Sequence, residues 1–174
     1  MEAQYIREID YPNWLANVVL VPNGKGKWRL CIDFINLNKA CLKDSYPLPW
    51  IDALINGMNE CLLMSFLGAF QGYHQIPLHC EDQEKMTFIT NKVTYCYTVM
   101  SFGLKNVGVI YRQLVNKLVQ HQLGRKMEAY VDDMLVKSLV VEHHPIDLEE
   151  CFQTLRKFHV KLNPIKCAFW SFCR

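Results

Sequence analysis

The sequence predicts an α+β protein in which helices pack on one face of an antiparallel sheet. Three observations predict it: apolar strand-like runs recur, turn residues join several of them as hairpins, and two segments carry apolar residues at helical spacing. With 174 residues, of which 51% are hydrophobic and 21% charged, the chain has the balance of a folded globular protein. We expect one domain, or two small lobes that share a core.

The chain begins with a predicted hairpin. Residues 14–22 (WLANVVLVP) are rich in Val and Leu, residues 23–26 (NGKG) are turn formers, and residues 27–34 (KWRLCIDF) alternate as a second strand. Residues 45–49 are predicted to be extended, because each proline disfavours helix in the residue before it. A short helix is predicted over residues 51–58, with a proline near its start.

Strands and one long helix are predicted for the middle of the chain. Residues 62–67 (LLMSFL) form a continuous apolar run that suits a strand buried on both faces. Residues 87–90 and 95–100 indicate two strands around a short turn. Over residues 105–121 the apolar side chains follow helical spacing, which predicts a helix.

The last third is predicted to contain an acidic hairpin and a second helix. Two apolar arms, residues 128–131 and 134–136, flank Asp132 and Asp133, which places the two acids at the tip. Residues 146–158 are amphipathic and predict a helix.

Charge and cysteine usage narrow the class of protein. The formal net charge is only +2, which does not by itself indicate nucleic-acid binding. Eight cysteines are scattered without a C-x-x-C pair, and the N-terminal residues form no apolar signal segment. No apolar run approaches the roughly 20 residues that a membrane span needs. We expect an intracellular protein, cytoplasmic or nuclear and not secreted, with reduced and mostly buried thiols.

The adjacent carboxylates of Asp132 and Asp133 are the most informative feature. Like charges at this range repel each other, and folding alone does not require the pair. A hard divalent cation such as Mg²⁺ would resolve the repulsion, since it prefers oxygen ligands and leaves sites open for phosphates. A solvent-exposed acidic turn is the plain alternative, because Asp is a common turn residue. The residues alone leave both readings open.

Five segments, taken in order, resemble the motifs of reverse transcriptases of the gypsy class of long-terminal-repeat retrotransposons. They are residues 27–34 followed by Leu37-Asn38 (fingers), 65–78 (SFLGAFQGYHQIPL, first palm motif), 102–106 (FGLKN), 130–133 (YVDD) and 162–167 (LNPIKC, late palm motif). The resemblance runs from about residue 14 to residue 169. It implies the fold of polymerase fingers and palm, and template-directed transfer of deoxynucleotides to a primer 3′-hydroxyl by a two-metal mechanism.

The resemblance also implies roles for particular residues. Asp132 and Asp133 would be catalytic and would hold Mg²⁺ or Mn²⁺. Nucleotide binding would fall to Lys27, Arg29, Tyr73, Phe102, Gly103 and Lys166. Arginine suits phosphate because its guanidinium fork holds two oxygens, and the bulk of Tyr73 would reject a ribose 2′-hydroxyl. The plain alternatives are a solvated strand, a core aromatic residue and a surface lysine.

The same resemblance predicts organisation and partners. Fingers would span about 14–60 and 79–100, and palm about 61–78 and 101–174, with thumb, connection and ribonuclease H regions absent. The expected partners are an RNA or DNA template-primer and deoxynucleoside triphosphates, with no membrane. Completion by a longer polyprotein or by a second subunit stays open.

The sequence departs from the family pattern at Gly68. A third metal-binding carboxylate is expected there, and glycine has no ligand atom, so the two-ion site is expected to be incomplete. Ile35 and Ser101 also replace residues that are usual in the family. We therefore expect a truncated, degenerate polymerase domain with impaired chemistry.

Two alternatives remain beside this interpretation. One is a catalytically inactive, transposon-derived remnant with at most weak nucleic-acid binding. The other is an unrelated small α+β domain whose acidic hairpin binds Mg²⁺ or Ca²⁺ for structure, which requires the five ordered motifs to be coincidence.

Overall fold

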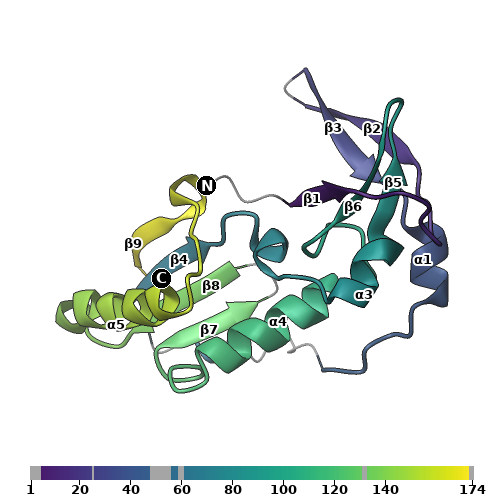
Figure 1. The fold of residues 1–174 in the computed structure, drawn as a ribbon. Helices are drawn as coiled ribbons and strands as arrows, with labels where there is room; N and C mark the ends of the chain where they lie inside the picture. The colour runs from purple at the N-terminus through teal and green to yellow at the C-terminus, as the bar shows by residue number, and fades with distance from the viewer. Residues whose placement is uncertain (1–4, 25, 48–55, 59–60, 131–132, 173–174) are drawn as a thin grey trace. The chain divides into compact units, whose positions relative to one another are not determined.

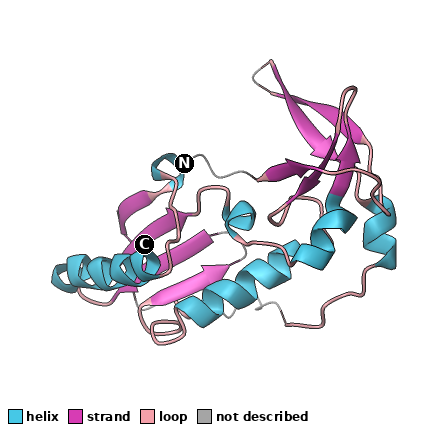
Figure 2. Cartoon of the chain, viewed as in Figure 1, coloured by secondary structure: helices cyan, strands magenta, loops and turns pink. Residues whose placement is uncertain are grey.

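The computed structural model describes residues 5–24, 26–47, 56–58, 61–130 and 133–172. Two compact units share the chain: the first comprises residues 1–44 and 73–107, and the second residues 45–72 and 108–174. Each unit combines helices with antiparallel strands (Figures 1 and 2). This is the mixed α+β architecture that the sequence predicts.

The first unit contains two small sheets. Strands β1 (Ile6–Glu8), β6 (Thr94–Tyr97) and β5 (Thr87–Ile89) form a sheet in the order β1-β6-β5. Strands β2 (Val18–Asn23) and β3 (Lys27–Ile32) form a separate antiparallel hairpin. Gly26 takes a positive φ of 71° in the connecting turn, which glycine adopts without steric cost.

Short helices complete the first unit. These are α1 (Ile35–Ala40), α3 (Cys80–Gln83) and two 3₁₀ turns, η1 (Gly72–Gln75) and η2 (Glu84–Met86). α1 follows β3 directly, because the Asp33 carboxylate accepts a hydrogen bond from the Ile35 N–H at 2.9 Å and turns the chain. The buried apolar side chains include Phe34, Tyr73, Met86, Phe88, Cys96 and Met100.

The second unit is built on a four-stranded antiparallel sheet in the order β7-β8-β4-β9. Its strands are β4 (Leu63–Gly68), β7 (Met127–Tyr130), β8 (Asp133–Ser138) and β9 (Ala168–Phe172). β4 and β8 supply most of its buried residues, including Leu63, Leu67, Met134 and Val136.

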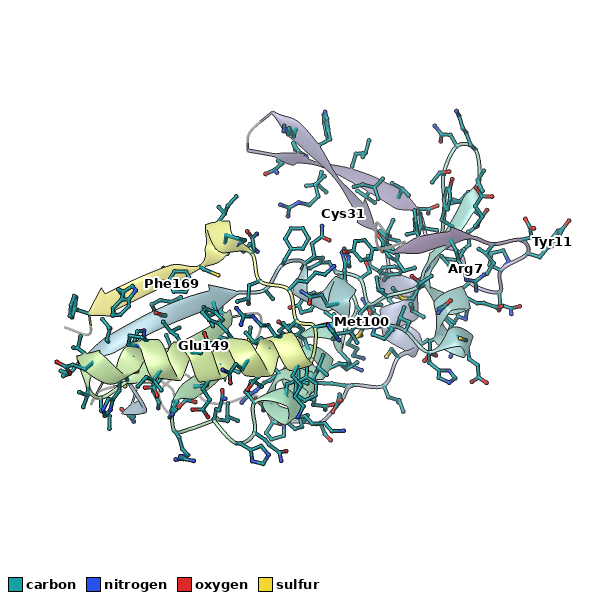
Figure 3. All side chains as sticks on the ribbon, turned by 60° about the vertical axis from the view of Figure 1, so that its left-hand side comes forward. Arg7, Tyr11, Cys31, Met100, Glu149 and Phe169 are labelled. Atoms are coloured by element: carbon teal, nitrogen blue, oxygen red, sulfur yellow. The ribbon has the colours of Figure 1, made fainter. Side chains whose placement is uncertain are left out.

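Helices α4 (Val107–Leu118) and α5 (His144–Lys157) follow the amphipathic spacing of the sequence. α5 packs against β8 through a buried stripe of Leu148, Cys151 and Leu155, while Glu149 projects from the helix (Figure 3). Pro145 lies in the first turn of α5. Backbone N–H groups there have no helical partner, so the N–H that proline lacks costs no hydrogen bond. Two further 3₁₀ turns are η3 (Val141–His143) and η4 (Pro164–Lys166).

The structure corrects several predicted element bounds. The first strand begins at residue 18 instead of 14, and the second ends at residue 32 because Asp33 initiates α1. The predicted strand over residues 95–100 ends at Tyr97. β1, α1, α3 and β9 were not predicted. The helix predicted over residues 51–58 falls mostly on residues 51–55, which lie outside the described residues.

The cysteines are less uniformly buried than expected. The seven cysteines of the described residues are free thiols, and Cys61, Cys96 and Cys151 are buried. Burial raises the pKa of the Cys151 thiol to about 12, which keeps it protonated. The expectation was wrong for Cys41 and Cys80, which are exposed because they lie at the ends of short surface helices.

Candidate active site

Asp133 and Gly68 face each other across two paired strands of the second unit. β4 and β8 are antiparallel, and their register places Gly68 directly opposite Asp133. On the other side of β8, Asp133 pairs with Tyr130 of β7. Residues directly opposite in an antiparallel pair present their side chains to the same face, with Cβ atoms about 5 Å apart. A side chain at position 68 would therefore project beside the exposed Asp133 carboxylate. Asp132 lies outside the described residues.

The space beside Gly68 is occupied by Lys166. A Cβ atom built on Gly68 would lie 2.6 Å from the Lys166 Cβ and 3.1 Å from the Lys166 carbonyl oxygen. Van der Waals contacts between carbon atoms are optimal at about 3.5–4.0 Å, so both positions cannot be filled without movement. Lys166 itself, which the resemblance assigns to nucleotide binding, lies exposed at the end of η4.

These residues do not fit a metal site with three carboxylates. Gly68 offers no side-chain oxygen as a ligand, and the place where a side chain would begin is filled by Lys166. Within the part of the chain that the structure describes, no three His, Cys, Asp or Glu side chains gather into a group that could hold an ion. Of the two predicted metal-binding aspartates, the structure describes Asp133 alone, and Gly68 lies directly opposite it in the sheet.

Tyr73 and Phe102 pack together in the first unit. Their ring centroids lie 4.8 Å apart in an edge-on arrangement. Tyr73 is buried and Phe102 is exposed, so the exposed phenylalanine ring packs against a buried tyrosine ring. Both rings are expected to bind the nucleotide, and in the structure they contact each other.

Gly103 and Asn38 fix the turn that follows Phe102. Gly103 has a φ of 94°, in the region that favours glycine. The Asn38 side chain donates to the Gly103 carbonyl at 2.7 Å and accepts from the Lys105 N–H at 2.8 Å. Asn38 belongs to the fingers motif of the sequence, but its hydrogen bonds to this turn were not predicted.

His74 lies among aromatic rings next to Tyr73. Its ring centroid lies 5.1 Å from that of Tyr5 and 5.8 Å from that of Phe102. Burial lowers the pKa of His74, since the charged form loses hydration. A neutral His74 suits this apolar surrounding, and sequence reasoning did not single it out.

Lys27 and Arg29 project from the same face of β3. They are two residues apart on a strand and pair with Asn23 and Val21 of β2. Both are exposed, and within the described residues neither has an ion-pair partner. The hairpin therefore presents two adjacent cations to solvent.

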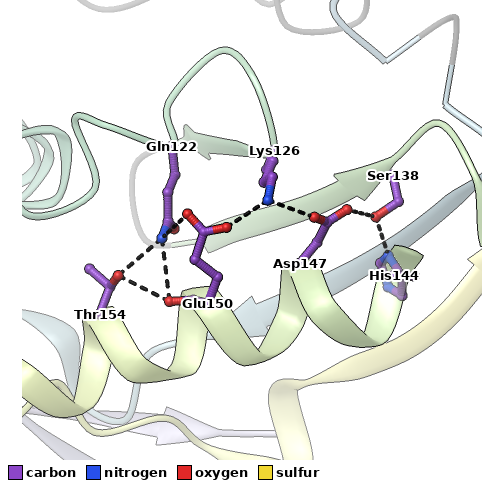
Figure 4. A network of polar contacts seen from close by, with 7 residues as sticks. All are labelled: Gln122, Lys126, Ser138, His144, Asp147, Glu150 and Thr154. Carbon is purple, nitrogen blue, oxygen red and sulfur yellow. Dashed lines mark hydrogen bonds and ion pairs between the residues drawn. The ribbon is translucent and has the colours of Figure 1, made fainter. Parts of the chain in front are cut away.

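A buried polar network that the sequence did not predict joins α5 to the sheet of the second unit (Figure 4). His144 is completely buried; its Nε2 lies 2.7 Å from Ser65 Oγ on β4 and its Nδ1 lies 2.8 Å from Ser138 Oγ on β8. Ser138 donates to Asp147 at 2.6 Å, and Asp147 pairs with Lys126 at 2.9 Å. Because Ser138 gives its proton to Asp147, Nδ1 donates to Ser138 and Nε2 accepts from Ser65. Burial lowers the pKa of His144, which favours the neutral imidazole in this network.

The family model described as "Reverse transcriptase (RNA-dependent DNA polymerase)" matches residues 21–172. The chain belongs to the reverse transcriptase family. This excludes the alternative of an unrelated small α+β domain.

This reverse transcriptase domain is similar in sequence to parts of curated transposon polyproteins. It is 32% identical over 150 residues to the retrovirus-related Pol polyprotein from transposon 412 of Drosophila melanogaster, covering 86% of this chain and 12% of that protein. The Pol polyprotein from transposon gypsy of the same species is 29% identical over 148 residues, covering 85% of this chain and 14% of its own length. The chain thus spans a small part of the polyproteins that it matches.

Solved structures share the reverse transcriptase fold. Native protease-reverse transcriptase of prototype foamy virus superposes with a TM-score of 0.82 at 20% identity, covering 95% of this chain and 22% of that chain. A foamy viral protease-reverse transcriptase in complex with RNA/DNA hybrid gives a TM-score of 0.85 at 18% identity, with the same coverage. Among the residues that the structure describes, no helix is long and apolar enough to cross a bilayer.

Proposed function

We propose that this chain is the fingers-and-palm part of a retrotransposon reverse transcriptase whose nucleotide transfer is impaired at position 68. The reaction of the family joins a deoxynucleotide to a primer 3′-hydroxyl on an RNA or DNA template. Template-primer and deoxynucleoside triphosphates are accordingly the proposed partners. A longer polyprotein is a proposed context, because the chain covers only 12% and 14% of two transposon relatives.

The register between β4 and β8 carries the proposal. It puts Gly68, which has no ligand atom, directly beside Asp133, where the family resemblance requires a carboxylate. In phosphoryl transfer, bound Mg²⁺ or Mn²⁺ stabilises charge on the reacting oxygens. If the missing ligand contributes several kcal/mol, the rate falls by about three decades, at about 1.4 kcal/mol per tenfold.

The remaining roles rest on the family resemblance and, for Lys27, Arg29, Tyr73, Phe102 and Gly103, also on the geometry of the first unit. Asp132 and Asp133 are the proposed surviving metal ligands. Lys27 and Arg29 share an exposed face of β3, which suits them to hold phosphate oxygens. Tyr73 supports Phe102, and Gly103 lets the backbone approach a ligand closely, which suits these residues to line a nucleotide. Lys166 is the proposed late-palm cation.

Template-primed incorporation of deoxynucleotides, with Mg²⁺ or Mn²⁺ present, tests whether nucleotide transfer by this chain is impaired. We expect the wild-type chain to incorporate at least about a thousandfold more slowly than the matching segment of a relative that carries Asp at this position. The Asp133→Asn variant, which lacks a proposed metal ligand, gives the background level of incorporation in this assay. Incorporation by the wild type above this background supports an impaired enzyme, and incorporation equal to it supports the inactive remnant. Wild-type activity equal to that of the relative would overturn the proposal.

A further inference from the structure

The side chain of Asn38 binds the backbone of the turn after residue 102 at two points. Its amide nitrogen donates to the Gly103 carbonyl at 2.7 Å, and its amide oxygen accepts from the Lys105 N–H at 2.8 Å. An asparagine can satisfy both backbone groups because its amide carries a donor and an acceptor. Asn38 lies on α1 and is half-buried, so the turn is tied to this helix.

The turn binds the end of α1 in return. Asn106 donates to the Leu42 carbonyl at 2.7 Å and accepts from the Asp44 N–H at 3.1 Å. The Lys105 ammonium group donates to the Cys41 carbonyl at 2.9 Å, just after the helix, where the last carbonyls have no helical partner. Residues 38–44 and 103–106 therefore hold each other through both backbones.

The turn also lies on the segment that joins β3 to α1. A Cβ atom at Gly103 would lie 3.7 Å from Cδ2 of the Phe34 ring and 3.8 Å from the Ile32 carbonyl oxygen, which are ordinary contact distances. Ile32 ends β3, the strand that carries the exposed cations Lys27 and Arg29. Residue 103 is thus placed against the end of the strand whose side chains are proposed to hold phosphate.

We infer that Asn38 is a positioning residue for the binding of a deoxynucleoside triphosphate: it fixes the Gly103 backbone, and with it the Phe102 ring, relative to the cations of β3. The inference rests on the proposed function, since it takes Phe102 and Gly103 to line the nucleotide. Glycine restricts its own backbone less than any other residue does, so bonds from outside the turn have to hold it. Contacts to the base and sugar should therefore depend on Asn38, and contacts to phosphate should not.

Isothermal titration calorimetry of the full 174-residue chain, with deoxyadenosine triphosphate and with inorganic tripolyphosphate in the same Mg²⁺ buffer, separates these contacts. Tripolyphosphate offers phosphate to the β3 cations but has no base or sugar for Phe102 to contact. We expect Asn38→Ala to weaken binding of deoxyadenosine triphosphate by about five- to tenfold, because the loss of two hydrogen bonds frees the turn. Binding of tripolyphosphate should change by less than about twofold. Asn38→Asp, which keeps the acceptor for Lys105 and loses the donor to Gly103, should fall between Asn38→Ala and the wild type.

Hydrogen exchange of the Lys105 amide, measured by NMR, provides a second readout that needs no ligand. We expect it to be at least about tenfold faster in Asn38→Ala, which removes the acceptor, and close to the wild-type rate in Asn38→Asp. Asn91→Ala is the matched control, because it truncates an exposed asparagine between β5 and β6 of the same unit. It should leave both affinities and this exchange rate unchanged.

The outcomes separate the inference from the proposed function. An equal loss of affinity for both ligands in Asn38→Ala would overturn the inference, because it would indicate general disruption of the unit instead of a misplaced turn. Faster exchange with unchanged affinity for deoxyadenosine triphosphate would also overturn it and leave Asn38 a structural residue. A wild-type chain that binds tripolyphosphate and not deoxyadenosine triphosphate would instead overturn the proposed function, in which Phe102 and Gly103 line the nucleotide.

Discussion

Single glycines control how closely neighbouring side chains approach in this protein. At Gly72, a Cβ atom would lie 2.9 Å from Cε2 and 3.1 Å from Cζ of the Tyr111 ring. Tyr111 is buried on α4 and belongs to the same unit as Gly72. The glycine therefore makes room for an aromatic side chain of a long helix, as Gly68 makes room for Lys166.

We predict that Gly72→Ala lowers the free energy of unfolding by about 1–3 kcal/mol, the usual cost of overpacking a filled core. A buried ring on a helix has little freedom to move aside. Urea denaturation measures the change. Gly24→Ala is the matched control, because nothing lies within 4 Å of a Cβ there, and it should alter stability by less than about 0.5 kcal/mol. Equal stability of Gly72→Ala and the wild type would contradict the predicted contact.

The residues of the site differ in how far the sequence could predict them. The order of the motifs predicted that Gly68 lies on a strand beside the acidic hairpin, and the register with Asp133 confirms that placement, while its role as a ligand position stays a prediction. The contact between Gly68 and Lys166 depends on how η4 packs against β4, across about a hundred residues of chain, and no local pattern contains it. The His144 network was missed for the same reason, because Ser65, Ser138 and His144 come from three separate elements.

At the scale of elements, long periodic segments were predicted and short irregular ones were not. α4 and α5 carry apolar stripes over several turns, so the helical period was visible. α1 has six residues and no buried side chain, which leaves no stripe to detect. β9 (AFWSF) is a short edge strand with mostly exposed side chains, although its aromatic residues favour a strand.

The polar network around His144 makes the packing of α5 sensitive to pH. Burial lowers the pKa of His144, with the nearby Asp147 carboxylate acting in the opposite direction. Protonation at Nε2 would make this nitrogen a donor, so the Ser65 hydroxyl would have to accept at this bond. The folded chain therefore binds a proton at His144 less readily than the unfolded chain does.

We predict that the free energy of unfolding falls as the pH is lowered below about 6.5, the pKa of an unfolded histidine. Between that value and the lower folded pKa, the unfolded chain binds more protons, so stability rises with pH. Urea denaturation at pH 7.5, 6.5 and 5.5 measures the slope. His74 also has a lowered pKa, so His144→Gln should reduce the slope without abolishing it. An unchanged slope in this variant would show that His144 is not a source of the pH dependence.

At the scale of the whole molecule, the candidate functional residues are divided between two units. Lys27, Arg29, Tyr73, Phe102 and Gly103 belong to the first unit, and Gly68, Asp133 and Lys166 belong to the second. The chain crosses between the units after residues 44, 72 and 107. Two of these crossings adjoin Gly72 and Val107, where η1 and α4 begin.

With a net charge of only +2, we expect the proposed binding of nucleic acid by this chain to be weak. Phosphate contacts by lysine and arginine release counterions, which gives affinity without sequence preference and makes binding fall with salt. We therefore predict weak binding to a primer-template duplex, with equal affinity for scrambled sequences. The dependence on salt should be shallow, corresponding to few phosphate contacts.

The β2–β3 hairpin is the expected source of those contacts. Lys27→Ala and Arg29→Ala should each reduce the slope of log affinity against log salt by about one, measured by fluorescence anisotropy from 50 to 200 mM salt. Lys85→Ala is the matched control: it removes the same charge from a lysine that already pairs with Asp82 at 2.8 Å. An equal effect of all three variants would mean that net charge, and not the hairpin, governs binding. Affinity that survives high salt would show that contacts other than those to phosphate dominate.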